Sequence, residues 1–245
     1  MSCRVVAVPV VPSCRPPVPG HVRRCLPLPA AACLLLFLLV PPLMSGQPFT
    51  LSERVLQEAQ ARYGTPARER LLAWQRLIRE GRHGSERDRL ELVNRFFNRM
   101  HFIDDAVHWQ QEDYWATPLE FLASGGGDCE DFSIAKYFTL RALGVKEDRL
   151  CLTYVKAVRL NRAHMVLTYY PQPGAEPLVL DNLVATIEPA SRRSDLLPVY
   201  SFNGTGLWLA RQRGRGRRVG ASDRLGRWQE LLARMQLLRL PASDF

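Results

Sequence analysis

Apolar residues recur every three or four positions through most of residues 49–100, which is the spacing of amphipathic helices. New helices can begin at Ser52, Thr65-Pro66 and Ser85, because these residue types favour a helix N-terminus, and Gly81 is a suitable stop for the second helix. The apolar positions are Val55, Leu56, Ala59, Leu71, Leu72, Trp74, Leu77, Ile78, Leu90, Leu92, Val93, Phe96 and Phe97. We therefore predict three helices that turn these stripes toward a core and their charged faces outward.

A further helical pattern begins directly after three glycines at 125–127. Cys129 is its first apolar residue, Asp128 precedes it in the N-cap position, and Gly144 follows where a C-terminal cap belongs. Asp131 lies three residues after Asp128, which is the position of the acid in a capping box. The pattern predicts a helix with Cys129 in its first turn.

The second half of the chain changes to short apolar runs separated by Gly, Pro and Asn, which is typical of strands joined by turns. The predicted strands cover residues 150–158, 164–170, 178–181, 196–202 and 207–209, and an amphipathic helix covers residues 225–240. The fold class that follows is α+β, with N-terminal helices and a cysteine-bearing helix packed on an antiparallel sheet.

The first 46 residues differ from the rest of the chain and predict a separate segment. Residues 1–24 contain arginines but no acid, and the uninterrupted apolar run 30–40 that follows is eleven residues long, bounded by prolines. This run is shorter than the roughly twenty residues that a membrane-spanning helix needs, and it resembles the core of an export signal. We predict an export signal in residues 1–46, or an uncleaved anchor as the alternative, followed by one domain over residues 47–245.

The net charge is +9, and arginine carries most of it. A basic protein favours anionic partners, but the sequence has no RNP motif, zinc-ligand spacing or basic-aromatic ladder, so we predict no nucleic-acid partner. Of the 6 cysteines only Cys129 and Cys151 lie in the predicted domain, which is too few for a disulfide scaffold.

Cys129 is the candidate nucleophile. The unpaired N–H groups and the dipole at a helix start favour a thiolate over a thiol. The alternative interpretation is that Cys129 is a small buried apolar residue, as lone cysteines often are. The residues that follow in the sequence favour the first interpretation.

His164 and Asp181 complete the candidate site. His164 opens one predicted strand and Asp181 closes the next. A hairpin centred near residues 172–173 would place the two residues directly opposite each other, within side-chain reach. Cysteine, histidine and an orienting acid are the parts of a Cys-His-Asp nucleophilic triad. His101 and His108 are weaker candidates for the base, because they lie in an irregular segment without an acid partner at strand spacing.

Residues 101–124 are rich in aromatic side chains and lead into the glycine loop. Thr117-Pro118 with Glu120 predicts a short helix in this segment. We predict that Trp115, Gly126 and Gly127 border the substrate groove, with packing beneath the helix as the alternative for the aromatic ring.

Several segments together resemble the bacterial transglutaminase-like cysteine proteinases of the LapG type. The matching segments are YWATPLEFL (114–122), GGDCEDF (126–132), AHMVL (163–167), LVLDNL (178–183), YSFN (200–203) and GLWL (206–209). The resemblance covers roughly residues 50–240. It implies a papain- and transglutaminase-like fold with Cys129 as nucleophile, His164 as base and Asp181 as orienting acid.

The resemblance also implies a function. Proteins of this type are periplasmic, calcium-dependent proteases that cut large surface adhesins near their N-termini, at a small-residue site, and so release cells from a biofilm. An inner-membrane receptor that senses cyclic-di-GMP sequesters them. The alternatives are a peptide-binding pseudoenzyme, which has no need of all three triad residues, and a transglutaminase, which uses the same triad with an amine in place of water.

Asp128, Glu130 and Asp131 match the calcium-binding region of the resembled family. Helix capping alone explains Asp128 and Asp131, but it leaves Glu130 without a role. Three carboxylates also oppose formation of the Cys129 thiolate, since a nearby like charge raises a thiol pKa. A bound Ca²⁺ would neutralise them, with further ligands from elsewhere in the chain because the spacing is not that of an EF-hand.

Overall fold

The computed structural model describes residues 49–209 and 216–237. The predicted signal in residues 1–46 and the end of the last predicted helix, residues 238–240, lie outside the described residues. Within the described ranges, no helix is both long and apolar enough to cross a membrane.

The predicted helices of the first part are present. They are α1 (Glu53–Tyr63), α2 (Thr65–Gly81) and α3 (Glu86–Phe97). Ser52 caps α1 by accepting a hydrogen bond from the N–H of Val55, and Ser85 forms a capping box with Asp88 at the start of α3. The apolar stripes pack inward as predicted, with Trp74 and Phe97 fully buried.

The segment between α3 and the cysteine helix contains more regular structure than the sequence predicts. Alongside the predicted short helix, which is α5 (Pro118–Ser124) with a capping box between Thr117 and Glu120, it forms α4 (Asp105–His108) and strand β1 (His101–Phe102). Strand β1 pairs in parallel with β2 (Gly126–Gly127). This pairing brings the start of the segment against the glycine loop.

Helix α6 (Cys129–Ala142) is the central element, and it begins at the cysteine as predicted. It is buried around most of its circumference rather than along one stripe, as a helix is when other elements pack on all sides. Gly144 follows it with a φ of 87°, a conformation that glycine adopts without steric cost. The predicted capping box at its start is wrong, because the Asp128 side chain makes no capping hydrogen bond.

The described part of the chain forms a seven-stranded sheet with the order β6-β5-β4-β3-β7-β8-β9, in which all neighbouring strands are antiparallel. The strands are β3 (Leu150–Ala157), β4 (Arg162–Tyr169), β5 (Leu178–Leu180), β6 (Glu188–Pro189), β7 (Leu196–Asn203), β8 (Gly206–Leu209) and β9 (Arg218–Gly220). Short 3-10 helices cover Glu147–Arg149, Ala190–Arg192 and Ser222–Arg224. The predicted strands are all found, within a few residues.

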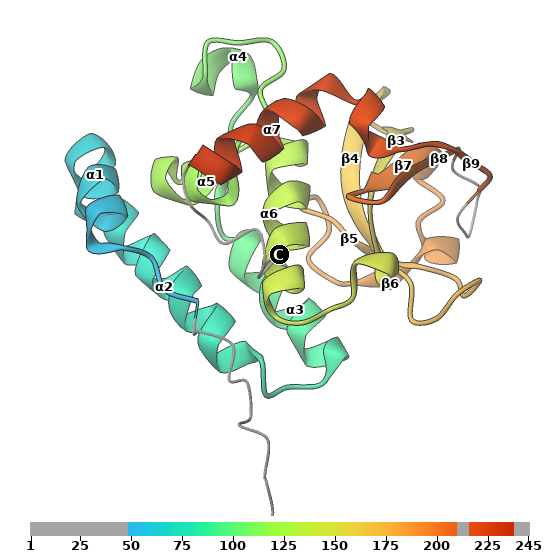
Figure 1. Ribbon diagram of the computed structural model, residues 1–245. Helices are drawn as coiled ribbons and strands as arrows, with labels where there is room; N and C mark the ends of the chain where they lie inside the picture. The colour runs from blue at the N-terminus through green and yellow to red at the C-terminus, as the bar shows by residue number, and fades with distance from the viewer. Residues whose placement is uncertain (1–48, 210–215, 238–245) are drawn as a thin grey trace, which may run out of the picture. The chain divides into compact units, whose positions relative to one another are not determined.

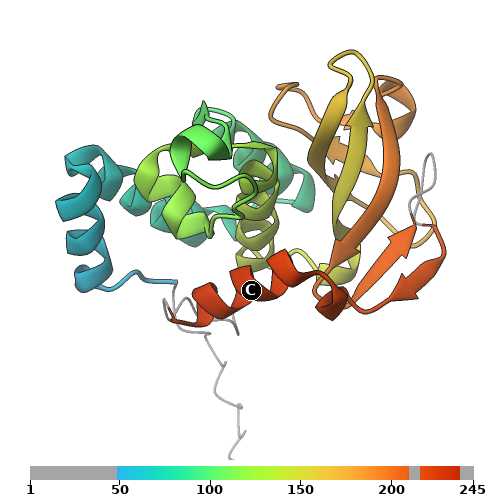
Figure 2. The same ribbon diagram turned by 90° about the horizontal axis from the view of Figure 1, so that it is seen from above.

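Helix α6 packs against β3 and β4, so that the helices gather on one side of it and the sheet on the other (Figures 1 and 2). Helix α7 (Gly226–Leu237) runs across the end of this arrangement, where Trp228 stacks on Phe138 of α6 with ring centroids 5.6 Å apart. The α+β class with an antiparallel sheet is confirmed.

Candidate active site

Cys129 and His164 line the same pocket, which has a volume of about 550 Å³. Cys129 reaches the pocket from the first turn of α6, and His164 reaches it from the start of β4. The pairing of β3 with β4 carries the histidine to this position, since Val155 of β3 lies beside His164 in the sheet. Cys151, in contrast, is fully buried within β3.

His164 is hydrogen-bonded to Asp181, with 2.8 Å between Nε2 and Oδ1. The two residues are not directly opposite each other as predicted, because the register pairs Leu167 with Leu180 and so brings Asp181 beside Val166. His164 and Asp181 are therefore diagonal neighbours on the same face of the strand pair, a distance that long side chains bridge. The bond occupies Nε2 and leaves Nδ1 as the ring nitrogen available to a thiol.

Asp181 is held as a carboxylate. Burial by itself favours the neutral acid, but the hydrogen bond and charge of His164, together with the N–H of Leu183, lower the pKa of Asp181 to about 2. An ionised acid bonded to Nε2 fixes the orientation of the imidazole and stabilises its protonated form. This is the geometry that a general base requires.

The thiol of Cys129 donates a hydrogen bond to Glu130, with 2.8 Å between Sγ and Oε2. Burial, this carboxylate and the charge of Asp128 raise the pKa of Cys129 well above its ordinary value. The helix start by itself favours the thiolate, but burial and the neighbouring acids outweigh this effect. Glu130 is thus a direct contact of the candidate nucleophile.

Asp131 is fully buried, and its carboxylate bonds to the loop before α5 instead of forming a capping box with Asp128. Its Oδ1 accepts a hydrogen bond from the N–H of Ala116 at 2.7 Å. This bond ties the loop that carries Trp115 to the first turn of α6. Trp115 lines the pocket but is only 7% exposed and stacks on Phe202, so its ring also has the packing role given as the alternative.

Gly126 and Gly127 are buried in β2 and do not line the pocket. A Cβ atom at Gly126 would lie 2.3 Å from the carbonyl oxygen of His101, and one at Gly127 would lie 2.1 Å from Oδ2 of Asp131. Both positions therefore need glycine so that the backbone can approach β1 and α6 closely. We assign them this packing role in place of the predicted groove role.

Carboxylates from α4 and α6 meet beside the nucleophile. One carboxylate oxygen each from Asp105, Asp128 and Asp131 lie within 4.8 Å of one another. Burial and the neighbouring acids raise the pKa of Asp105 to about 6 and that of Asp128 to about 10, and they raise the pKa of Asp131 well above its ordinary value. A second group joins Asp105 to Glu130 and to Asp113 of the loop after α4.

These residues fit a calcium ion. Each of Asp105, Asp128 and Asp131 has a buried carboxylate oxygen without a hydrogen-bond partner, namely Oδ1, Oδ1 and Oδ2 respectively. Ca²⁺ binds oxygens at about 2.3–2.6 Å, so two of its ligands lie at most about 5 Å apart, which the cluster satisfies.

Sequence reasoning identified Asp128, Glu130 and Asp131 but missed Asp105 and Asp113, because nothing in their spacing indicates that the loop folds back onto α6.

The two competing histidines do not line the pocket that holds Cys129. His101 is exposed in β1, and burial lowers the pKa of the half-buried His108. His164 is therefore the base candidate that the structure brings to the cysteine's pocket.

The fold, together with a cysteine and a histidine in one pocket, defines a cysteine protease of the papain and transglutaminase-like class. The family model described as bacterial transglutaminase-like cysteine proteinase BTLCP matches residues 79–205. The chain belongs to this family of cysteine proteases.

Solved structures of Legionella pneumophila LapG are similar to this chain over most of its length. One form and an EGTA-treated form each show 46% sequence identity and a TM-score of 0.66, covering 77% of this chain and 99% of theirs. A calcium-bound form shows 46% identity and a TM-score of 0.65, covering 76% of this chain and 99% of its own. A search of curated protein sequences found no significant match.

Proposed function

We propose that this protein is a calcium-dependent periplasmic endopeptidase that cuts a large surface adhesin near its N-terminus, with Cys129 as nucleophile, His164 as general base and Asp181 as orienting acid. The observation that carries the proposal is the 2.8 Å bond from His164 Nε2 to Asp181, beside a pocket that His164 shares with Cys129. The 46% identity to LapG supports the same assignment.

Acylation begins with proton transfer from Cys129 Sγ to Nδ1 of His164. The thiolate then attacks the scissile carbonyl carbon, and the C–N bond breaks as the imidazolium returns its proton to the leaving amine. Asp181 stabilises the imidazolium during this exchange, because it is buried and ionised. Backbone N–H groups at the start of α6 are the candidates to stabilise the oxyanion.

Deacylation uses water, which His164 activates as a base in the same way. Water attacks the thioester, the C–S bond breaks, and the thiol regains its proton from the imidazolium. An amine in place of water would give transglutamination by the same residues. The class of the family favours hydrolysis.

Asp105, Asp128 and Asp131 would hold the calcium ion, with Glu130 and Asp113 close to it. A bound cation would neutralise the carboxylates that now raise the pKa of the thiol. The fold brings these five acids, which come from α4, the loop after it and the start of α6, close to Cys129. The existence of a calcium-bound form of LapG supports calcium as the ion.

The proposed substrate and partners follow from the family resemblance. The adhesin is cut at a small-residue site, which releases the cell from a biofilm, and an inner-membrane cyclic-di-GMP receptor sequesters the protease. Export by residues 1–46 would place the enzyme in the periplasm. Mass spectrometry of a periplasmic extract should find a mature chain that starts near residue 46, whereas an intact N-terminus in the cytosol would refute export.

Incubation of the purified protein with an N-terminal adhesin fragment from the same organism tests the activity. We expect one cut, mapped by N-terminal sequencing, that requires Ca²⁺ and is lost in the Cys129→Ala variant. Incorporation of an amine into a glutamine side chain without cutting would show a transglutaminase instead. Capture of the uncut fragment, with no covalent product, would show a binding module.

A further inference from the structure

Asp181 has a partner on the side away from His164. Its Oδ2 accepts a hydrogen bond from Nη2 of Arg193 at 2.7 Å, and the Arg193 side chain is only 5% exposed. Arg193 follows the 3-10 helix Ala190–Arg192 and is 12 residues beyond Asp181, so the loop between them folds back to make the contact. A buried ion pair of this kind offsets the cost of burying each charge alone.

The guanidinium of Arg193 is itself held in place. Asp195 accepts from Nε at 3.0 Å and from Nη2 at 2.9 Å, which is the two-point contact that the planar group of arginine favours. Nη2 thus bridges the carboxylates of Asp195 and Asp181. Arg193 cannot turn away from Asp181 without breaking both contacts to Asp195.

Each oxygen of the Asp181 carboxylate consequently has its own partners. Oδ1 accepts from His164 and from the N–H of Leu183, and Oδ2 accepts from Arg193. If Oδ2 had no donor, the carboxylate could rotate about its Cβ–Cγ bond and let the bond to His164 lengthen. One more charged group, Lys136 on α6, interacts with Asp181. Burial lowers the pKa of Lys136 to about 7, and the negative charge of Asp181 partly offsets this effect.

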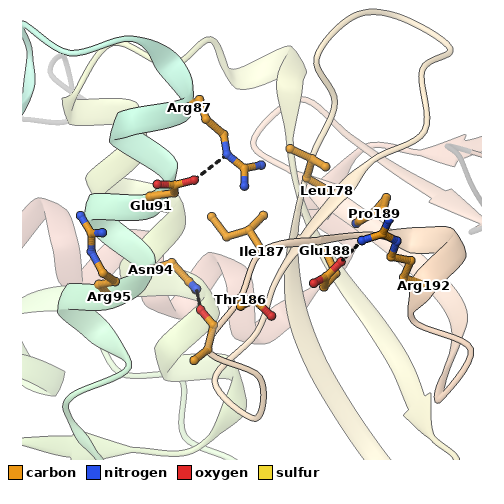
Figure 3. A pocket seen from close by; sticks show the side chains of 11 residues that line it. Arg87, Glu91, Asn94, Arg95, Leu178, Thr186, Ile187, Glu188, Pro189 and Arg192 are labelled. Atoms are coloured by element: carbon orange, nitrogen blue, oxygen red, sulfur yellow. Dashed lines mark hydrogen bonds and ion pairs between the residues drawn. The ribbon is translucent and has the colours of Figure 1, made fainter.

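The neighbouring arginine provides a contrast. Arg192 is 74% exposed, pairs with Glu188 at 3.4 Å, and lines a separate pocket of about 640 Å³ between α3 and residues 185–192 (Figure 3). Two arginines that line this pocket form ion pairs with glutamates that also line it, Arg87 with Glu91 and Arg192 with Glu188 (Figure 3). Arg193 does not line this pocket and instead points at the buried acid.

We propose that Arg193 is a positioning residue for catalysis, which, braced by Asp195, holds the Asp181 carboxylate so that Oδ1 stays bonded to His164. The inference rests on the proposed roles of His164 and Asp181. Arg193 does not line the pocket that holds Cys129, so its loss should lower the rate of the chemical step and leave substrate binding nearly unchanged.

Two measurements on the full chain test this role. The first is the ¹H NMR resonance of the Nε2 proton that His164 donates to Asp181, assigned by its absence in His164→Gln. The second is the steady-state cleavage of the adhesin fragment, separated into kcat and KM. Both are compared in wild type, Arg193→Gln and the matched control Arg192→Gln, with circular dichroism to confirm folding.

In Arg193→Gln we expect the Nε2 resonance to shift or vanish and kcat to fall at least tenfold, with KM within twofold of wild type. Arg192→Gln should keep both values. An unchanged resonance or a kcat within twofold of wild type in folded Arg193→Gln overturns the proposal, as does an equal loss in Arg192→Gln.

A second variant covers the case in which Arg193→Gln does not fold. Arg193→Lys keeps the charge but cannot contact Asp195 at two points and Asp181 at the same time, so we expect a weakened resonance and a kcat at least threefold lower. Wild-type values in Arg193→Lys then overturn the proposal. If the wild-type enzyme cleaves no fragment, the proposed substrate is wrong, and the resonance alone still decides the role of Arg193.

Discussion

The Sγ atom of Cys129 lies 2.8 Å from Oε2 of Glu130, its neighbour in the chain. The thiol donates this hydrogen bond, so the contact stabilises the protonated form of the candidate nucleophile and opposes its activation. An enzyme that needs the thiolate must therefore neutralise the adjacent acids or move them. The partnerless carboxylate oxygens of Asp105, Asp128 and Asp131 nearby are suited to a cation that would do so.

The assignment of the nucleophile predicts different results for the two cysteines of the domain. Cys129→Ala should reduce cleavage of the adhesin fragment below detection, because no other thiol lines the pocket among the described residues. Cys151→Ala should keep kcat/KM within about twofold, since the buried strand position affects only packing. Equal losses in two folded variants, measured by fragment cleavage and circular dichroism, would contradict the assignment.

Asp181→Asn should lower kcat by about three to four orders of magnitude while the protein stays folded. The amide keeps the shape of the side chain but loses the charge that orients His164 and stabilises its imidazolium, a loss that costs about 10⁴ in a serine protease. Cleavage kinetics of the purified variant check this. An activity within tenfold of wild type would show that Asp181 is not the third member of the triad.

Asp105→Asn should weaken the apparent calcium affinity at least about tenfold, because it removes one of three clustered carboxylates. Calcium titration of both proteolysis and the unfolding temperature measures the effect. Asp223→Asn is the control, as this exposed acid belongs to none of the carboxylate clusters in the described structure and does not line the pocket of Cys129. Full activity of the wild type after exhaustive chelation would show that proteolysis does not need calcium and that these acids have a purely structural role.

Stability without calcium should fall as the pH rises from 5 to 7. Burial and neighbouring acids raise the pKa of Asp105 to about 6 and that of Asp128 to about 10, so these two acids keep protons in the folded protein that they lose in the unfolded chain across this range. The lowered pKa values of His108 and Lys136 act in the opposite direction, but Asp128 stays protonated over the whole range and outweighs them. Asp181 titrates below this range, because its pKa is lowered to about 2. We therefore expect Tm in EGTA to be at least about 5 °C lower at pH 7 than at pH 5.

Calcium should flatten this pH dependence, because a bound cation favours the ionised carboxylates in the folded state. Asp128→Asn should also flatten it in EGTA, by removing one of the titrating groups. Thermal unfolding followed by circular dichroism gives both slopes. A Tm in EGTA that rises from pH 5 to pH 7 would contradict the raised pKa values.

The sequence by itself determined the elements whose signals are local. Ser52, Ser85 and Thr117 begin helices where predicted, because a cap and its partner lie within three residues of each other. The strand pattern also sufficed to bring His164 and Asp181 together. Side chains on one face of adjacent strands remain neighbours even when the register shifts by two residues.

Tertiary structure alone decided how the acids around Cys129 are used. Asp131 has the spacing of a capping-box residue, yet it bonds to Ala116 because α5 and its loop pack against α6. Asp105 lies in the cluster because the pairing of β1 with β2 brings its segment against the start of α6. Arg193 contacts Asp181 because the loop between the two residues folds back on itself. These contacts join segments far apart in the chain, and they depend on packing that no local pattern encodes.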